Sequence, residues 1–496
     1  MQDYLSGMPE LVALAGAPPS MERFAEVRAA KQASYSPEQR ALLVDVLKAQ
    51  NPHLSPSEQS ALDALQAGGM AVVTGHQLMA AGGTAFFEFK ILKTVALARR
   101  LSQEWETPVV PIFWMASEDH DFEEIASVRV GDGVFTWQQE HHGAPVGRLD
   151  SSSLGLQLEA WAVERPLSTA QRAELARRIK AYQKSSTLAD ATRAWVREWA
   201  EGLGLLVLDG DDALLKNSAA PIWEAERQGR LSQAIEQQTT KVVAAGYRAQ
   251  VFPRPINLFH FKNGQRLRVL DPAEVPTQDY SAVSPNALLR PVYQEWVLPN
   301  LAYVGGGGEL AYWFQLGAAF ETLQVPMPLL YLRDSVAVSS TKAERALAGA
   351  SLQWEEVFRF DKEALLKDRL GYYTRLREET AELGSPLEAA VDQWNETLVK
   401  RYPELQQHAA AFSAKMRKLN ERTTQVRYRA IKKQEHLFLQ HVEAVYNQIY
   451  PGGVFWERRA SYLDLMGDFD EDPRDRLLAI MSAIQAGTHI IKPEKV

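Results

Sequence analysis

The chain contains no cysteine among its 496 residues. This absence excludes disulfide bonds, cysteine-ligated zinc or iron–sulfur centres and a thiolate nucleophile. Long apolar runs are also missing, because the most apolar stretch, residues 108–116, is about half of what a membrane-spanning helix needs. The first residues show no basic segment followed by an apolar core, so they do not predict a secretory signal. We therefore expect a cytoplasmic protein.

An excess of positive charge is absent as well. The net charge is −8, which argues against a protein that coats nucleic acid but leaves small anionic ligands open. Hydrophobic residues make up 46% of the chain and charged residues 23%, which is typical of a globular protein and not of a disordered one. A length of 496 residues exceeds what one hydrophobic core usually serves, so we expect two or three domains.

Five short apolar runs predict the strands of a sheet, at residues 70–73, 109–116, 203–208, 301–304 and 328–332. Helical patterns separate these runs, as at residues 86–101. Unbroken apolar runs that alternate with helices are typical of a parallel sheet buried on both faces, and hence of an α/β fold. Ligands bind beyond the carboxyl ends of such strands, so the residues that follow each run are the first candidates for a site.

Two insertions interrupt this pattern. Residues 127–200 are β-like at first and helical over 169–199, and residues 245–290 carry a predicted hairpin around Lys262-Asn263-Gly264. From about residue 340 to 450 the sequence is charged and helix-forming, and Pro451-Gly452-Gly453 ends this region. Apolar residues within it recur at alternating spacings of four and three, which predicts a heptad seam through Phe412, Met416, Leu419, Thr423, Val426 and Ala430.

The first apolar run ends in Thr74-Gly75-His76-Gln77, and the pair Gly82-Gly83 follows. A strand that ends in a glycine turn before a helix presents free backbone N–H groups to a phosphate or carboxylate. His76 and Gln77 could hydrogen-bond that anion or orient a leaving group. The alternative is a plain strand–helix turn, because the spacing matches neither a P-loop nor a GxGxxG fingerprint.

The second run ends in Ser117-Glu118-Asp119-His120-Asp121, where four ionisable residues stand together. Such crowding shifts pKa values and suits general acid–base catalysis or a divalent cation. We predict catalytic roles for Glu118, Asp119, His120 and Asp121, and no resident metal site. The alternative is a helix N-terminus, whose dipole favours acidic residues but does not account for the histidine.

The fourth run opens into Gly305-Gly306-Gly307-Gly308-Glu309 ahead of a helix. Four consecutive glycines are costly to order, which favours close approach of a ligand to the backbone over a purely structural role. Arg148 and Arg290 are candidate carboxylate clamps, with surface ion pairs as the alternative.

Taken together, the motifs resemble the bacillithiol biosynthesis cysteine-adding enzyme family. The resemblance is carried by Thr74-Gly75-His76-Gln77 with Gly82-Gly83 and Lys90, by Phe113-Trp114-Met115-Ala116-Ser117-Glu118-Asp119-His120-Asp121-Phe122-Glu123-Glu124, by Pro145-Val146-Gly147-Arg148, by Asn257-Leu258-Phe259, by Ser284-Pro285-Asn286-Ala287-Leu288-Leu289-Arg290-Pro291 and by Ala302-Tyr303-Val304-Gly305-Gly306 with Glu309. Order and spacing hold over nearly the whole chain. The chain departs from the family pattern at Leu78-Met79, Ala81 and Thr84, where a Pro-Gly pair, an aromatic residue and a proline are common.

The resemblance implies a Rossmann-like core with connecting insertions over residues 1–340. It also implies an α-helical coiled-coil domain at 341–450 that mediates homodimerisation, and a C-terminal segment, 451–496, that returns to the core. Lys90 and Asn257 join the expected binding residues.

The implied activity is ATP-dependent ligation of L-cysteine to the amine of glucosaminyl-malate, the last step of bacillithiol synthesis. ATP or ADP is the implied cofactor, with room for Mg²⁺. The implied partners are small molecules and a second copy of the chain, with no nucleic acid and no membrane.

Two other function classes stay open: a nucleotidyl-transfer or hydrolytic enzyme on the same fold, and a non-catalytic dimeric scaffold built on the helical domain. Amide formation requires activation of the carboxylate by adenylation or by acyl phosphate, and the sequence is compatible with both routes. The missing cysteines add one constraint, because no enzyme-bound thioester can be the activated intermediate.

Overall fold

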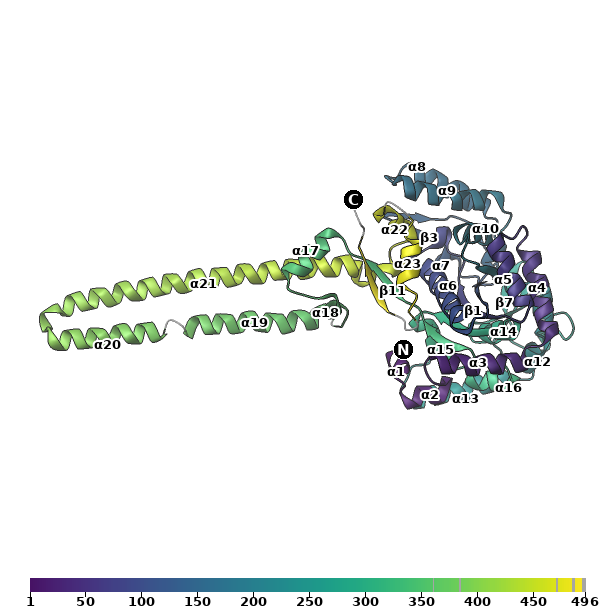
Figure 1. The fold of residues 1–496 in the computed structure, drawn as a ribbon, viewed down its shortest axis with the longest axis horizontal. Helices are drawn as coiled ribbons and strands as arrows, with labels where there is room; N and C mark the ends of the chain where they lie inside the picture. The colour runs from purple at the N-terminus through teal and green to yellow at the C-terminus, as the bar shows by residue number, and fades with distance from the viewer. Residues whose placement is uncertain (360, 383–384, 470–471, 484–486, 493–496) are drawn as a thin grey trace. The chain divides into compact units, whose positions relative to one another are not determined.

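The computed structural model describes residues 1–359, 361–382, 385–469, 472–483 and 487–492. The chain divides into two compact units. The first unit comprises Met1–Val336 and Glu457–His489 and contains the central sheet. The second unit comprises Ala337–Trp456 with a short piece of the C-terminal strand, and it is mainly helical (Figure 1).

A five-stranded parallel sheet forms the centre of the first unit. In spatial order its strands are β10 (Leu329–Leu332), β9 (Asn300–Gly305), β1 (Met70–His76), β2 (Val109–Met115) and β5 (Leu206–Asp209). Each strand overlaps one of the five apolar runs, so the prediction of a parallel α/β core is confirmed. From β1 the chain proceeds to β2 and β5 on one side and later to β9 and β10 on the other. Such a reversal opens a crevice at the carboxyl ends of the central strands.

Both faces of the sheet are buried, because alternate side chains of each strand point to opposite sides. Met70 and Val72 of β1 pack with α3 (Met21–Ser34) and α6 (Phe86–Trp105). Ala71 and Val73 belong to the larger core on the other face, together with residues of the helices α4, α5 and α11–α14. Full burial of one valine stabilises the fold by about 1.5–3 kcal/mol, which is why continuous apolar runs are retained here.

The N-terminal helices precede the sheet, and two of them, α4 and α5, begin at Ser-Pro steps. They are α1 (Gln2–Leu5), α2 (Pro9–Ala15), α3, α4 (Pro37–Gln50) and α5 (Pro56–Gln66). Ser36 and Ser55 accept the N3 backbone N–H of α4 and α5, and each forms a capping box with proline at the first helical position.

The region of the first insertion contains one short helix, a hairpin and three longer helices. Its elements are α7 (Phe122–Ile125), β3 (Ser127–Val130), β4 (Gly133–Thr136), α8 (Ser152–Val163), α9 (Thr169–Lys184) and α10 (Leu188–Trp199). The helical stretch predicted at 169–199 is therefore two helices, because Thr187 breaks the run and caps α10 through Asp190 N–H. After β5 come α11 (Ala213–Ser218), α12 (Ala220–Arg227) and α13 (Arg230–Ala244).

The second insertion contains the predicted hairpin, as β6 (Leu258–Lys262) and β7 (Gln265–Arg268). Asn263 and Gly264 have φ values of 53° and 78°, as a two-residue I′ turn requires. A third strand, β8 (Val283–Pro285), pairs with β6 and was not predicted. The first unit continues with α14 (Leu289–Val297), α15 (Gly307–Trp313) and α16 (Gly317–Leu323).

Near the end of the chain lie α22 (Tyr462–Asp468), α23 (Arg474–Ile480) and β12 (Thr488–Ile491), which pairs with β11 (Ser335–Val338). Within the first unit, α22 packs against α9 and α23 packs against α6. Buried Lys93 of α6 donates to the carbonyl oxygens of Met481 and Ala483 at 3.0 and 2.8 Å, and its ammonium lies 2.7 Å from the Asp334 carboxylate.

The second unit consists of α17 (Thr341–Gly349), α18 (Trp354–Arg359), α19 (Lys362–Glu382), α20 (Ser385–Arg401) and α21 (Gln406–Ile449). The long helix α21 packs along α17, α19 and α20 (Figure 1). The face of α21 buried in this packing includes Ile431 and Phe438. Leu419 and Val426 of the predicted heptad seam are 56% and 62% exposed, so they do not form the core between α21 and these neighbours.

Candidate active site

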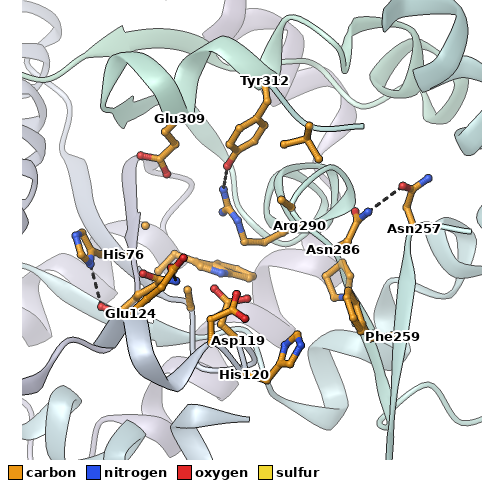
Figure 2. Close-up of a pocket in the computed structure, with 18 of the residues that line it drawn as sticks. His76, Asp119, His120, Glu124, Asn257, Phe259, Asn286, Arg290, Glu309 and Tyr312 are labelled. Carbon is orange, nitrogen blue, oxygen red and sulfur yellow. Dashed lines mark hydrogen bonds between the residues drawn. The ribbon is translucent and has the colours of Figure 1, made fainter. Parts of the chain in front are cut away.

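A cavity of about 930 Å³ opens at the carboxyl ends of β1 and β2 and is walled by the hairpin β6–β7 and by α15 (Figure 2). Most of the residues predicted for the site line this cavity: Gly75, His76, Gln77, Lys90, Asp119, His120, Asp121, Asn257, Arg290 and Glu309. The remaining predicted residues are not part of its lining: Thr74, Gly82, Gly83, Glu118, Arg148, Gly305 and Gly306. The sheet topology thus brings together segments that are far apart in the sequence.

Asp119 and His120 lie on the loop after β2 and share one cationic partner, Arg266 of β7. Arg266 Nη1 is 3.3 Å from Asp119 Oδ1 and 3.2 Å from His120 Nδ1. A guanidinium can only donate, so Nδ1 of His120 accepts and the proton of the neutral ring resides on Nε2. Arg266 is itself buried and donates to Ser284 Oγ and Pro285 O at 3.0 and 2.7 Å. The three-stranded sheet β7–β6–β8 therefore fixes the position of this Asp–His pair.

The segment 145–148 supports the same loop from behind. Val146 N–H donates to Asp119 O at 2.6 Å, and Gly147 N–H donates to Ser117 O at 2.8 Å. A Cβ atom at Gly147 would lie 3.0 Å from Ser117 Cα and closer still to other Ser117 atoms, so only glycine allows this approach. This contact gives a physical reason for the Pro-Val-Gly-Arg motif.

Glu118 and Arg148 join a charge network outside the cavity lining, in which Glu118 and Lys216 are buried and Arg148 is exposed. Lys216 Nζ lies 2.7 Å from Glu118 Oε1 and 2.5 Å from Asp211 Oδ1. Arg148 binds Asp211 with two hydrogen bonds of 2.9 and 3.0 Å. Burial raises the pKa of Glu118, and the Lys216 ammonium opposes that rise. Arg148 was predicted to clamp a ligand carboxylate. In the structure it binds a carboxylate of its own chain, that of Asp211.

Another part of the cavity lining is a polar cluster of Lys90, Glu309, Tyr303, Arg290 and Tyr312. Figure 2 labels three of its members, Glu309, Arg290 and Tyr312. Lys90 Nζ lies 2.7 Å from Glu309 Oε2, and Tyr303 Oη donates to Glu309 Oε1. Arg290 Nη2 donates to Tyr312 Oη at 3.0 Å. Burial alone would raise the pKa of Glu309, but Lys90 and Arg290 hold it below its usual range. Glu309 is therefore ionised with both oxygens engaged, as a counter-ion and not as a proton acceptor.

His76, at the end of β1, is neutral at physiological pH. Burial and the nearby Lys90 ammonium lower the pKa of His76 to about 3. Its Nδ1 lies 2.9 Å from Gln77 O, so Nδ1 carries the proton and Nε2 is left as an acceptor. Gln77 donates to Glu124 Oε2 at 2.9 Å. Thr74, by contrast, donates to Val304 O at 2.7 Å and ties β1 to β9.

The glycine pair 82–83 belongs to a buried turn beside the cavity. Ala81, Gly82 and Gly83 all have positive φ values, of 47°, 83° and 67°. Arg178 of α9 donates to Ala81 O, and Ala81 N–H donates to Tyr182 Oη at 3.0 Å. The turn is therefore held by the first insertion.

The same arginine contacts a buried carboxyl group beside this turn. Arg178 Nη2 lies 3.0 Å from Glu88 Oε1. Burial raises the pKa of Glu88 to about 8, although Arg178 acts in the opposite direction. Only the flanks of the turn, Met79 and Thr84, reach the cavity lining.

Gly305 and Gly306 allow tight packing at the start of α15. A Cβ atom at Gly305 would lie 2.8 Å from Leu310 Cδ2, and Gly306 N–H donates to Glu309 Oε2 at 3.4 Å. Neither glycine has a positive φ. Their contribution to the cavity is thus to place the Glu309 side chain.

Asn257 reaches the cavity from the segment before β6. Its side-chain oxygen accepts from Asn286 Nδ2 at 2.8 Å (Figure 2), and its amide donates to Arg254 O at 3.1 Å. It therefore links the loop before the hairpin to the loop before α14.

The hairpin supplies cavity residues that the sequence analysis did not identify as site residues, namely Phe259, Arg266 and Arg268. Phe259 pairs with Arg268 across the two strands, and Phe261 pairs with Arg266. These four side chains share one face, because alternate residues of paired strands point the same way. The sequence did contain a signal for these residues, the alternation of aromatic and basic side chains along the two strands. It could not show which face of the hairpin lines the cavity, because that depends on tertiary packing.

The described residues include no group of three or more His, Asp or Glu side chains arranged to hold a metal ion. In the same part of the chain, no helix combines the length and apolar character needed to cross a bilayer. What the cavity offers is a carboxylate and a neutral histidine on one wall, a buried Lys–Glu pair on another, and several arginines. Such a lining suits proton transfer and the binding of anionic groups.

Comparison with known proteins gives a consistent family. Residues 1–334 match the family model described as bacillithiol biosynthesis BshC, N-terminal Rossmann-like domain. Three curated relatives carry the name "Putative cysteine ligase BshC". The relative from Flavobacterium johnsoniae is 32% identical over 72% of this chain and 72% of its own length. Those from Flavobacterium psychrophilum and Cytophaga hutchinsonii are 29% and 32% identical, over 99% and 87% of this chain and 96% and 85% of their own lengths.

Among solved structures, a Campylobacter jejuni chain titled as an arginyl-tRNA synthetase covers 86% of this chain, and this chain covers 96% of it. The identity is 10% and the TM-score 0.26, too low to support any inference.

Proposed function

The chain belongs to the bacillithiol biosynthesis BshC family, and we propose from this membership that it is an ATP-dependent ligase. The reaction joins the carboxyl group of L-cysteine to the amine of glucosaminyl-malate as the last step of bacillithiol synthesis. The observation that supports this most directly is the convergence of Asp119, His120 and Arg266 in a cavity that also contains the Lys90–Glu309 pair. Amide formation needs a proton acceptor for the amine and cationic groups for an activated carboxylate.

Asp119 is the proposed general base. One of its oxygens, Oδ1, is held by Arg266, and its side chain is 36% exposed, so an amine in the cavity can reach Oδ2. His120 is less suited to accept this proton, because Nδ1 already accepts from Arg266 and Nε2 carries hydrogen. Its Nε2–H is instead a donor for negative charge that develops on the reacting carboxyl oxygen.

Activation of the cysteine carboxylate requires ATP. Attack on the α-phosphate gives an acyl adenylate and pyrophosphate, and attack on the γ-phosphate gives an acyl phosphate and ADP. In both routes the ammonium group of the acceptor first loses one proton to solvent, the resulting amine attacks the acyl carbon and passes a second proton to Asp119, and AMP or phosphate leaves. Both routes form an intermediate without an enzyme thiol, in keeping with a chain that has no cysteine.

The cavity lining is compatible with a nucleotide and its magnesium ion. Arginine side chains match phosphate oxygens through charge-assisted hydrogen bonds. Mg²⁺ bound to ATP usually takes one or two protein carboxylates in addition to phosphate oxygens and water. Asp121 and Glu124 line the cavity and offer oxygen ligands of that kind.

A purified-enzyme assay tests the proposal. The full chain is incubated with glucosaminyl-malate, L-cysteine and ATP, and the thiol product, AMP, ADP and pyrophosphate are quantified. The variant Asp119→Asn should lower the rate by about 10²–10⁴-fold, the usual contribution of a positioned base. Asp132→Asn, at an exposed turn outside the cavity, is the matched control.

Three outcomes would contradict the proposal. Folded protein that yields no thiol product with any nucleotide would exclude the ligase. Pyrophosphate release without cysteine would favour nucleotidyl transfer, and full activity of Asp119→Asn would remove this residue from the mechanism.

We also propose that the protein is a homodimer through α21. Leu419 and Val426 of the heptad seam are exposed in the single chain, and heptad-spaced apolar residues on a long helix are typical of coiled-coil interfaces.

A further inference from the structure

The charged side chains that line the cavity fall into paired and unpaired groups. Five basic and four acidic side chains line it, in a chain whose net charge is −8. Lys90 is paired with Glu309, Arg266 with Asp119, and Arg290 donates to Gln294 and Tyr312. Among the described residues, no carboxylate lies within ion-pair distance of Arg254 or Arg268. Two cations on the cavity wall are therefore free to bind a ligand anion.

The chain holds the backbones of these two arginines firmly in place. Arg254 N–H donates to Asn257 Oδ1 at 3.3 Å, and Arg254 O accepts from Asn257 Nδ2 at 3.1 Å. Arg268 pairs with Phe259 across the hairpin, and its guanidinium lies 5.5 Å from the centre of the Phe259 ring. The backbones are thus ordered before any ligand arrives, and both side chains are exposed on the cavity wall.

Arg268 lies next to the proposed reaction centre on the same face of β7. Arg266, two residues earlier, contacts both Asp119 and His120. Two residues along a strand separate Cα atoms by about 7 Å. A ligand whose anionic groups bind Arg268 therefore extends past Arg266 to reach Asp119.

We propose that Arg254 and Arg268 form a dicarboxylate-binding subsite that holds the malyl group of the acceptor substrate. The identity of the acceptor rests on the proposed function, whereas the anion preference rests on the two unpaired arginines. Each guanidinium presents a planar fork that matches one carboxylate, so two arginines suit two carboxylates. The amine at the other end of the same molecule is cationic before it reacts, and it would lie near Asp119, Asp121 and Glu124.

The charge pattern of the cavity favours this orientation over a triphosphate at the same place. Asp121 and Glu124 lie on the wall that carries Asp119, and they repel a triphosphate there unless Mg²⁺ lies between, whereas an ammonium group is attracted to them directly. A molecule with a dianionic end and an ammonium end is complementary to both walls. Arg254 and Arg268 would thus determine which acceptor substrate is bound and in which orientation.

Direct binding tests the subsite without any need for turnover. L-Malate is titrated into the full-length protein by calorimetry, with the variants Arg254→Gln, Arg268→Gln and the double variant. Each single change should weaken binding about tenfold and the double change about a hundredfold, as expected for loss of charge-assisted hydrogen bonds. Lys262→Gln at the hairpin turn and Arg248→Gln in the preceding loop are the matched controls, since both residues are exposed and outside the cavity lining. These controls should leave malate binding unchanged.

Kinetics separates this inference from the proposed function. If the ligase reaction occurs, the double variant should raise KM for glucosaminyl-malate and leave KM for ATP and for cysteine unchanged. Glucosamine lacks the malyl carboxylates, so we expect the wild type to use it slowly and the double variant to use it at the same rate. Malate binding that depends on both arginines in a protein without ligase activity would support the subsite and refute the function. Normal KM for glucosaminyl-malate in an active double variant would refute the subsite alone. A selective loss of ATP binding would assign the two arginines to the nucleotide.

Discussion

Gly82 offers a sharp test of the turn beside the cavity. Its φ of +83° is in the left-handed region, and a Cβ atom there would lie 2.8 Å from Glu88 Oε1 and still closer to the Arg178 guanidinium. Gly246 has nearly the same φ, +86°, but a Cβ atom there would meet no atom within 4 Å. The substitutions Gly82→Ala and Gly246→Ala therefore share one backbone penalty and differ in crowding alone.

The expected magnitudes follow from these two terms. An alanine in the left-handed region costs about 1–2 kcal/mol at either position. Crowding of a packed interior adds about 1–3 kcal/mol, and only Gly82→Ala incurs it, because Arg178 and Glu88 are both buried. Gly82→Ala should therefore be less stable than Gly246→Ala by about 1–3 kcal/mol. At about 2 °C per kcal/mol for a large domain, the difference in Tm is about 2–6 °C.

Differential scanning calorimetry of the full chain measures this difference, with the wild type and both variants scanned at the same rate. The assay for ligation provides a second readout, because a displaced turn moves Met79 and Thr84 in the cavity wall. Equal Tm values for the two variants would show that Arg178 moves aside at no cost. The turn would then not be rigidly held by α9, and the argument that this insertion shapes the cavity would fail.

Three further predictions concern charge and assembly. Glu309→Gln leaves buried Lys90 without its carboxylate and should destabilise the protein by about 3–5 kcal/mol. Adding Lys90→Met should restore part of that loss, which a double-mutant cycle of thermal unfolding measures. Strictly additive effects of the two substitutions would contradict the coupling. His76 is neutral in the folded state and has a pKa near 6.5 when unfolded, so it lowers stability as pH falls below about 6.5, by up to about 1.4 kcal/mol per pH unit. His76→Asn should therefore show a shallower loss of Tm between pH 6.5 and 4 than the wild type, and identical slopes would be evidence against a buried neutral ring. Leu419→Glu should leave Tm of a monomer unchanged but weaken the proposed dimer in light scattering, and an unaltered mass would refute the seam as the interface.

The sheet was predictable from the sequence because it depends on local composition. Each strand of a parallel sheet buried on both faces needs an unbroken apolar run, and the sequence contains five such runs, one for each strand. The position of Asp119 and His120 followed from the same logic, since both directly follow β2. Strand order, however, depends on contacts between distant segments, and no local pattern encodes it.

Side-chain direction within the motifs was beyond the reach of sequence patterns. Glu118 and Asp119 are adjacent, yet Glu118 pairs with buried Lys216 and Asp119 lines the cavity. Arg148 meets Asp211 only because β5 lies beside β2 in the sheet. The sequence likewise could not show that Arg254 and Arg268 are available to bind a ligand, because this depends on the absence of ion-pair partners among the described residues around them.

The discontinuous first unit has a consequence for how the protein is made. Because Glu457–His489 belongs to the same unit as the sheet, synthesis must pass residue 489 before that unit can be completed. Until then Lys93 lacks the carbonyl acceptors of Met481 and Ala483, and α6 lacks the cover of α23. The helical unit, whose residues emerge earlier, is free to fold during this wait. A shortened protein for structural or biochemical work should therefore join residue 336 to residue 457 directly, and a simple C-terminal truncation should yield an aggregation-prone chain.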